Sequence, residues 1–112
     1  MRLNADLRHS APIFAALGDE TRLLLLARLS AGEPLSIARL AAGATVTRQA
    51  ITKHLHVLEG AGLVRGSRQG REQLWELDPR QLAEARQAID RIAAHWDGAL
   101  LRLKESLEKE TT

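Results

Sequence analysis

Residues 46–55, Val46-Thr47-Arg48-Gln49-Ala50-Ile51-Thr52-Lys53-His54-Leu55, decide the fold that this sequence predicts. Thr47 is expected to be an N-cap, because a threonine hydroxyl accepts a hydrogen bond from an N–H group of the first helical turn. The helix should run to about Gly60, where the glycines of Gly60-Ala61-Gly62 end it. The stretch therefore predicts a capped helix with a polar and cationic first turn.

This helix is expected to have an apolar side and a polar side. Successive residues on an α-helix are about 100° apart, and this angle sorts the side chains onto two faces. The side expected to be buried consists of Ala50, Ile51, His54, Val57, Leu58 and Ala61, with Leu55 at its boundary. The opposite side consists of Arg48, Gln49, Thr52, Lys53 and His56. His54, on the apolar side, is expected to form a hydrogen bond inside the domain.

A shorter helix is predicted directly before it. Ser36 can cap a helix over Ile37–Ala42, and Gly43-Ala44-Thr45-Val46 connects that helix to the next one. Two consecutive helices joined by about four residues that include a glycine are typical of a helix-turn-helix. The same spacing occurs in other all-α proteins, so the residues that follow must support this interpretation.

Two short strands are predicted after the helix pair. Leu63–Arg68 and Glu72–Leu77 are separated by Gln69-Gly70-Arg71, which contains the glycine typical of a hairpin loop. Gln73, Trp75 and Leu77 share one face of the second strand. A lone hairpin is only marginally stable, so this one must pack against the helices. A basic hairpin directly after a basic helix is the arrangement of a wing.

Three more helices complete the prediction. A first helix over residues 7–17 ends at Gly18, and Asp19 caps a second, leucine-rich helix over Glu20–Leu29. Asp78 and Pro79 start a last helix that runs to about Leu107 or Glu108. The chain is therefore predicted to be mainly α with a small β-hairpin wing, a winged helix-turn-helix in a single domain over residues 1–112.

The last helix has more apolar surface than a small domain needs for its own core. Leu82, Ile89, Trp96 and Leu103 recur every seven residues, and Ala85, Ile92 and Ala99 follow three residues behind them. A helix from a second chain is the natural partner for such a seam. The alternative is packing across its own domain. Trp96 is expected to be a core residue, with the lining of a ligand pocket as the less common possibility.

The charge of the chain is concentrated in one segment. The formal net charge is only +2. Between Thr45 and Arg71, however, five basic residues face one acid, Glu59, so the segment carries +5 − 1 = +4 and the rest of the chain −2. The basic residues are Arg48, Lys53, Arg65, Arg68 and Arg71. Such a stripe indicates a polyanionic partner, although a merely solvated face has the same composition.

The polar side of the helix after Thr47 has the groups that read duplex DNA. Recognition helices contact base edges with their N-terminal residues. Arg48 can pair with guanine and Gln49 with adenine, whereas Thr47 and Thr52 can reach phosphates or a thymine methyl group. The expected DNA-binding residues are Thr47, Arg48, Gln49, Thr52, Lys53 and His56, with Arg68 and Arg71 in the wing. The alternative for the two wing arginines is protection of a solvated strand edge.

Several function classes are excluded or disfavoured by what the sequence lacks. There is no cysteine, which excludes disulfides, thiolate metal sites and cysteine nucleophiles. The longest apolar run, Leu23–Ala27, is far shorter than the roughly 20 residues of a membrane span, and no signal peptide is visible. No catalytic motif is present, so we expect a soluble cytoplasmic protein that is not an enzyme and holds no cofactor.

These residues together resemble the ArsR-type family of bacterial repressors. The resemblance spans about residues 10–107 and depends on the segments Phe14–Arg22, Thr47–Leu55, Val57–Val64 and Gly70–Pro79. It implies a homodimeric winged helix-turn-helix repressor that dimerises through its first and last helices and binds operators of small operons. The residues then expected in the dimer interface are Phe14, Leu82, Ile89, Ile92, Trp96 and Leu103.

The sequence departs from this family where its metal sensors bind their ions. The third helix of such sensors has a Cys-x-Cys motif, and this chain has Leu35-Ser36-Ile37-Ala38-Arg39-Leu40 there. The last helix has Asp90, His95 and Asp97 but no second histidine. No metal site is therefore predicted, although His9 and His95 can meet at a dimer seam. The inducing signal stays open between a small ligand, an oxygen- and nitrogen-bound metal, a partner protein and none.

The partners predicted are duplex DNA and a second copy of the chain, with no membrane. The alternative function is a winged-helix module that binds an acidic protein and reads no DNA sequence. Salt-sensitive binding to a promoter fragment distinguishes the two.

Overall fold

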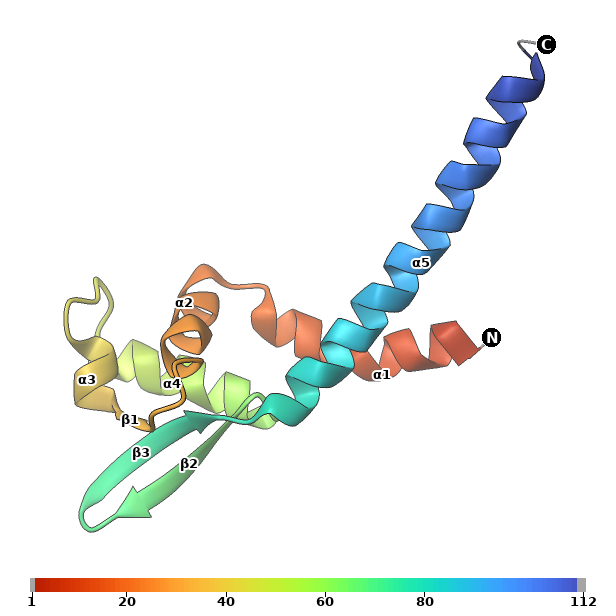
Figure 1. The fold of residues 1–112 in the computed structure, drawn as a ribbon. Helices are drawn as coiled ribbons and strands as arrows, with labels where there is room; N and C mark the ends of the chain where they lie inside the picture. The colour runs from red at the N-terminus through yellow and green to blue at the C-terminus, as the bar shows by residue number, and fades with distance from the viewer. Residues whose placement is uncertain (1, 111–112) are drawn as a thin grey trace.

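The computed structural model describes residues 2–110. Most of these residues lie in helices, and they include one sheet (Figure 1). The elements in chain order are α1 (Arg2–Leu17), α2 (Glu20–Leu29), β1 (Leu35–Ser36), α3 (Ile37–Ala41), α4 (Arg48–Gly60), β2 (Val64–Gln69), β3 (Glu72–Leu77) and α5 (Pro79–Glu110). The predicted fold class, mainly α with a β-hairpin wing, is confirmed. The first helix is longer than predicted, because residues 2–6 lack the apolar periodicity by which its start was judged.

The predicted caps form in the structure. The side chain of Asp19 accepts a hydrogen bond from Arg22 N (3.1 Å), that of Ser36 from Arg39 N (3.2 Å) and that of Thr47 from Ala50 N (3.1 Å). Each bond satisfies one N–H group that the helix itself leaves without a partner. The starts of α2, α3 and α4 therefore follow from local interactions.

The sheet has three antiparallel strands in the order β1-β3-β2. The hairpin pairs Val64 with Leu77 and Gln69 with Glu72, and Gly70 turns the chain with φ 64°. That backbone conformation costs glycine little and other residues more. Strand β1 was not predicted, since its two residues have no alternation to detect. It pairs Leu35 with Trp75 and so ties the wing to the start of α3.

The core lies where α4 packs against α2, α3 and the sheet. Ile51, Leu55 and Leu58 of α4 have no solvent exposure, whereas Val57 is 46% exposed. The predicted buried face was therefore wrong at Val57, and Leu55, which was placed at its boundary, is fully buried. The true stripe follows the spacing i, i+4 and i+7, which places all three side chains on one narrow face of the helix, centred near Ile51.

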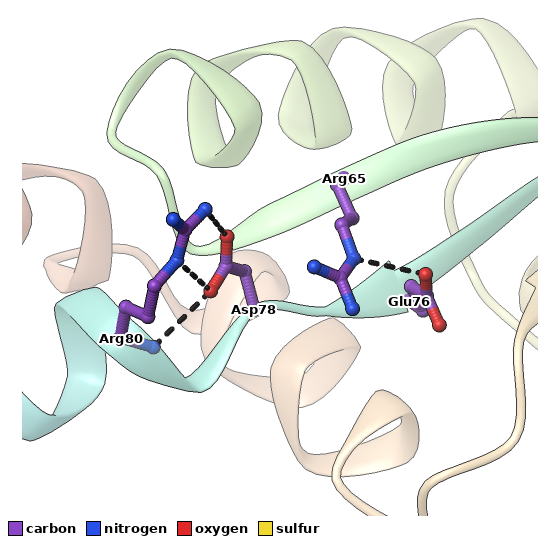
Figure 2. Close-up of polar contacts among 4 residues, drawn as sticks. All are labelled: Arg65, Glu76, Asp78 and Arg80. Carbon is purple, nitrogen blue, oxygen red and sulfur yellow. Dashed lines mark hydrogen bonds and ion pairs between the residues drawn. The ribbon is translucent and has the colours of Figure 1, made fainter.

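Helix α5 starts at a capped and ion-paired end (Figure 2). Asp78 accepts hydrogen bonds from the backbone N (3.2 Å), Nε (3.1 Å) and Nη2 (2.7 Å) of Arg80. The side-chain and backbone hydrogen bonds from Arg80 lower the pKa of Asp78 from 3.8 to about 2. Asp78 N also donates to Leu63 O (2.9 Å), which joins the start of α5 to the chain just after α4.

Beyond its first turns α5 leaves the rest of the chain (Figure 1). Helix α1 packs on the first part of α5, where Ala85 and Ala88 are buried. Trp96 is 65% exposed. The expectation that it is a core residue is therefore wrong within the single chain. The projecting part of α5 bears a series of exposed apolar side chains: Ile89, Ile92, Trp96, Leu100, Leu103 and Leu107.

The Asp78–Arg80 pair predicts a pH dependence of stability. Because the folded-state pKa of Asp78 lies below its ordinary value, the carboxylate stabilises the fold above about pH 4, and this contribution is lost as the pH falls toward 2. Asp78→Asn should lower the free energy of unfolding at pH 7 and flatten its decline between pH 4 and pH 2. Urea unfolding followed by circular dichroism at fixed protein concentration measures both.

Glu33→Gln is the matched control, since Glu33 is an exposed carboxylate in the loop between α2 and β1. This variant should keep the decline of the unmodified chain. A decline in Asp78→Asn as steep as in the control would contradict the role given to the pair.

Candidate nucleic-acid interface

The first turn and a half of α4 presents its polar side chains to solvent. Arg48, Gln49 and Lys53 are exposed, and Thr47 caps the helix directly before them. The burial of Ile51, Leu55 and Leu58 on the other side fixes this orientation. Cationic and amide groups thus stand together at the N-terminal end of a helix, where the helix dipole also favours an anion.

The two threonines of this face are already engaged in local hydrogen bonds. Thr47 Oγ1 accepts from Ala50 N, which leaves the hydroxyl hydrogen available for another acceptor. Thr52 Oγ1 donates to Arg48 O at 2.9 Å, and its side chain is half-buried. In this rotamer Thr52 has no hydroxyl hydrogen left for a phosphate oxygen, so its methyl group is the part suited to a base contact.

His56 lies toward the wing end of the same face. Its ring is 5.7 Å from the ring of Trp75 in an edge-on contact, and its Nδ1 is 3.5 Å from a carboxylate oxygen of Glu59. The side chain is nevertheless 61% exposed. His56 thus lies against the wing and away from the first turn that holds Arg48 and Gln49.

The wing has two exposed arginines near its tip. Arg68 pairs in register with Gln73 on the neighbouring strand, and Arg71 lies in the turn after Gly70. Arg65, nearer the base of the hairpin, is different because its Nε donates to Glu76 Oε1 at 2.9 Å (Figure 2). Sequence counting treated all basic residues of the segment alike, whereas the fold neutralises Arg65 with an acid on the opposite strand.

Four basic side chains of the segment stay without an acidic partner among residues 2–110. They are Arg48, Lys53, Arg68 and Arg71, two on α4 and two on the wing. The helix and the wing therefore each present a cationic surface, and the acids that lie nearest are Glu59 on α4 and Glu72 beside Arg71. Such a surface is suited to a polyanion that is broad enough to meet both elements.

A cluster that was only partly foreseen holds α4 in place. Arg22 donates Nε–H to Ala16 O (2.6 Å) and lies 3.3 Å from His54 Nδ1 through Nη1. His54 Nδ1 is in turn 3.8 Å from Asp19 Oδ2. The backbone N–H of Arg22, then the charges of Arg22 and His54, lower the pKa of Asp19. The internal hydrogen bond expected of His54 is present. The role of Arg22 has no local sequence signal, because the partners of its side chain lie on two other elements, α1 and α4.

The described part of the chain has neither a metal site nor a membrane-spanning helix. Among the side chains that the structure describes, no three His, Cys, Asp or Glu residues are placed to hold one metal ion. His9 lies 3.5 Å from Glu84 of α5. No helix within residues 2–110 is long and apolar enough to cross a membrane.

Helix α3, a short connection, helix α4 and the β2–β3 hairpin define a winged helix-turn-helix protein. Residues 17–67 match the family pattern of a helix-turn-helix domain. The chain is 37% identical over 95 residues to the HTH-type transcriptional regulator Rv2034 of Mycobacterium tuberculosis, and this alignment covers 85% of each protein.

Solved structures show the same similarity. The ArsR-like transcriptional regulator from Rhodococcus sp. RHA1 is 36% identical, with a TM-score of 0.75 over 94% of this chain and 95% of that one. The homodimeric winged helix-turn-helix DNA-binding domain Mb0332 from Mycobacterium bovis shares the fold, with a TM-score of 0.63 at 23% identity over 81% of this chain and 84% of that one. The chain belongs to the ArsR family of winged helix-turn-helix transcriptional regulators.

The cluster around Arg22 predicts a loss of stability when its hydrogen bonds are removed. Arg22→Gln keeps a polar side chain but loses the guanidinium that reaches Ala16 O and His54. We expect the free energy of unfolding to fall by about 1.5–3 kcal/mol, the range for hydrogen bonds of charged groups. Urea unfolding measures it.

Arg86→Gln serves as the control, because Arg86 is exposed on α5. Its stability should stay within about 0.5 kcal/mol of the unmodified chain, as for ordinary surface changes. Equal stability of the two variants would contradict the role of Arg22.

Proposed function

We propose that the protein acts as a homodimer that binds a near-palindromic operator in duplex DNA and represses transcription from it. The observation that carries this proposal is the pair of exposed cationic surfaces on α4 and on the wing, two elements that contact each other. Duplex DNA presents phosphates on both sides of each groove, so one partner can meet both surfaces.

Helix α4 is the proposed reading element. Its exposed first turn places Arg48 to pair with guanine and Gln49 to pair with adenine in the major groove. Lys53, one turn further along, is suited to a phosphate, and the hydroxyl of Thr47 can donate to another. Thr52 and His56 border this surface. They are proposed to add contacts to DNA without the paired hydrogen bonds to a base that Arg48 and Gln49 make.

The wing is the proposed second contact. Arg68 and Arg71 flank the tip of the hairpin, where a long cationic side chain can enter or border the minor groove. Arg65 is left out of this contact, because its guanidinium is paired with Glu76.

A second copy of the chain is the proposed partner of α5. Ile89, Trp96 and Leu103 are 52%, 65% and 56% exposed, which water disfavours for side chains of this size in a continuous series. Phe14 and Leu82, which are proposed for the same interface, are partly buried against the core, and their helices α1 and α5 contact each other. The structural neighbour from Mycobacterium bovis is homodimeric, which supports the same assembly.

Dimerisation also gives the operator its proposed symmetry. Two recognition helices related by a two-fold axis reach successive major grooves about 34 Å apart, so the site should be a near-palindrome. A dimer seated there would exclude RNA polymerase from an overlapping promoter, which is the proposed basis of repression.

The reading residues are tested with DNA from upstream of the protein's own gene. The double variant Arg48→Ala, Gln49→Ala should lose the preference for this DNA over a scrambled duplex, since each bidentate pair contributes about 1–3 kcal/mol of discrimination. Fluorescence anisotropy over a salt series measures affinity for both duplexes, and the dimer mass should not change. Arg86→Ala, which removes a cation from α5, is the matched control and should keep the preference.

The affinity of the unmodified chain for DNA should fall steeply with salt. The logarithm of the association constant should fall with the logarithm of the salt concentration, with a slope of roughly −0.9 for each phosphate neutralised. A preference retained by the double variant would contradict the reading residues alone. Salt-independent binding, or binding only to an acidic protein, would contradict the whole proposal.

The dimer is tested by placing a charge in the seam. Leu103→Asp and Leu101→Asp change residues that are 56% and 57% exposed on the same helix. Two residues along a helix point roughly 160° apart, so only Leu103 shares the face of Ile89 and Trp96. Light scattering measures the molar mass in solution. Leu103→Asp should have the mass of one chain, 12.3 kDa, whereas Leu101→Asp and the unmodified protein should have the mass of two chains. A monomeric Leu101→Asp, or a dimeric Leu103→Asp, would contradict this seam.

A further inference from the structure

A groove of about 650 Å³ lies between α2, α3 and the connection that leads to α4. Its floor and walls include Leu24, Leu25, Leu40, Val46 and Ile51. Leu24 is 60% exposed, so the groove has an apolar side chain that is open to solvent. The size and the apolar lining are those of small-molecule sites in proteins, which measure about 300–1,000 Å³.

Arg28 is the charged side chain among the residues that line the groove. Its Nη1 donates to the carbonyl oxygens of Arg39 and Leu40, both at 3.0 Å. These two bonds hold the guanidinium at the end of α3. In the part of the chain that the structure describes, Nε and Nη2 of Arg28 have no hydrogen-bond acceptor. A fixed guanidinium with free N–H groups beside an apolar groove is suited to a carboxylate that ends a hydrocarbon chain.

We infer that this groove binds an amphiphilic carboxylate, with its apolar chain along the leucines and its carboxylate on Arg28. The charge and the lining both select this chemistry: a neutral hydrocarbon leaves Arg28 unused, and a small polar anion leaves the apolar walls wet. The remaining polar side chains of the lining, Thr21 and Thr45, bring hydroxyl groups and no competing charge.

The groove lies apart from the proposed dimer seam. Helices α2 and α3 stand on one side of the molecule, and the projecting part of α5 leaves from the other (Figure 1). A partner held along that part of α5 would therefore not cover the groove. One wall is the segment 42–46, and Thr47, which caps α4, follows it directly. A bound carboxylate would thus contact the segment that sets the start of the proposed reading helix.

The inference does not depend on DNA binding, so it is tested without DNA. Decanoate is added to the ¹⁵N-labelled full-length protein, and amide chemical shifts are followed by NMR. Saturable shifts should concentrate in Gly43, Ala44 and Thr45, which line the groove. Decanol has the same chain without the charge, and we expect it to bind roughly tenfold more weakly, because it makes no charge-assisted hydrogen bonds to Arg28.

Two variants separate the apolar and the ionic parts of the site. Ala27→Phe places a ring in the groove while Arg28 stays, and it should abolish the decanoate shifts. Ala94→Phe makes the same change on the exposed surface of α5 and should leave them intact. Arg28→Met should remove the difference between decanoate and decanol.

The inference is overturned if decanoate shifts only residues of α5, since that result means uptake on the exposed apolar face of that helix. It is equally overturned if Ala27→Phe binds decanoate as the unmodified chain does, or if decanol binds as tightly as decanoate.

Discussion

The complete burial of Ile51, Leu55 and Leu58 is the constraint on which the other features of this protein depend. These three side chains fix the rotation of α4 about its own axis against α2, α3 and the sheet. Burying a large aliphatic side chain is worth about 1.5–3 kcal/mol, so a rotation that exposed all three would cost much of the stability of a small domain. The exposed side of α4 is thus held as firmly as the core.

Electrostatics then divides the basic residues of the helix-turn-helix and wing by role. Arg65 is neutralised by Glu76 across the hairpin, and Arg22 is used to join α2 to α1 and α4. Arg28 supports the end of α3 through two carbonyl oxygens. Between Thr45 and Arg71, the cations left for a partner are those of the α4 surface and the wing tip. In an ArsR-family regulator, this division separates the arginines that build the domain from those proposed to contact DNA.

The parts of the site that sequence could predict are those made by neighbours along the chain. Thr47 caps α4 and Gly70 turns the wing, as predicted, because both interactions lie within a few residues. The sequence did not show that Leu55 is buried and Val57 exposed. A helical wheel sorts side chains by angle alone, so it cannot show on which side α4 has neighbours. Trp96 was expected both in the core and in the dimer interface. It is exposed on the single chain, because a seven-residue repeat does not show whether its own domain or a second chain covers the seam.

By itself the sequence determined the order of the helices and the wing, their caps and turns, the excess of positive charge and the absence of thiolates. These features depend on residue type and short spacing. Tertiary structure alone decided the strand β1, the pairing of Arg65 with Glu76, the cluster of Arg22 with His54, and the groove beside Arg28. Each of them joins elements distant in sequence, and such contacts arise only when burial of the common core has set how those elements pack.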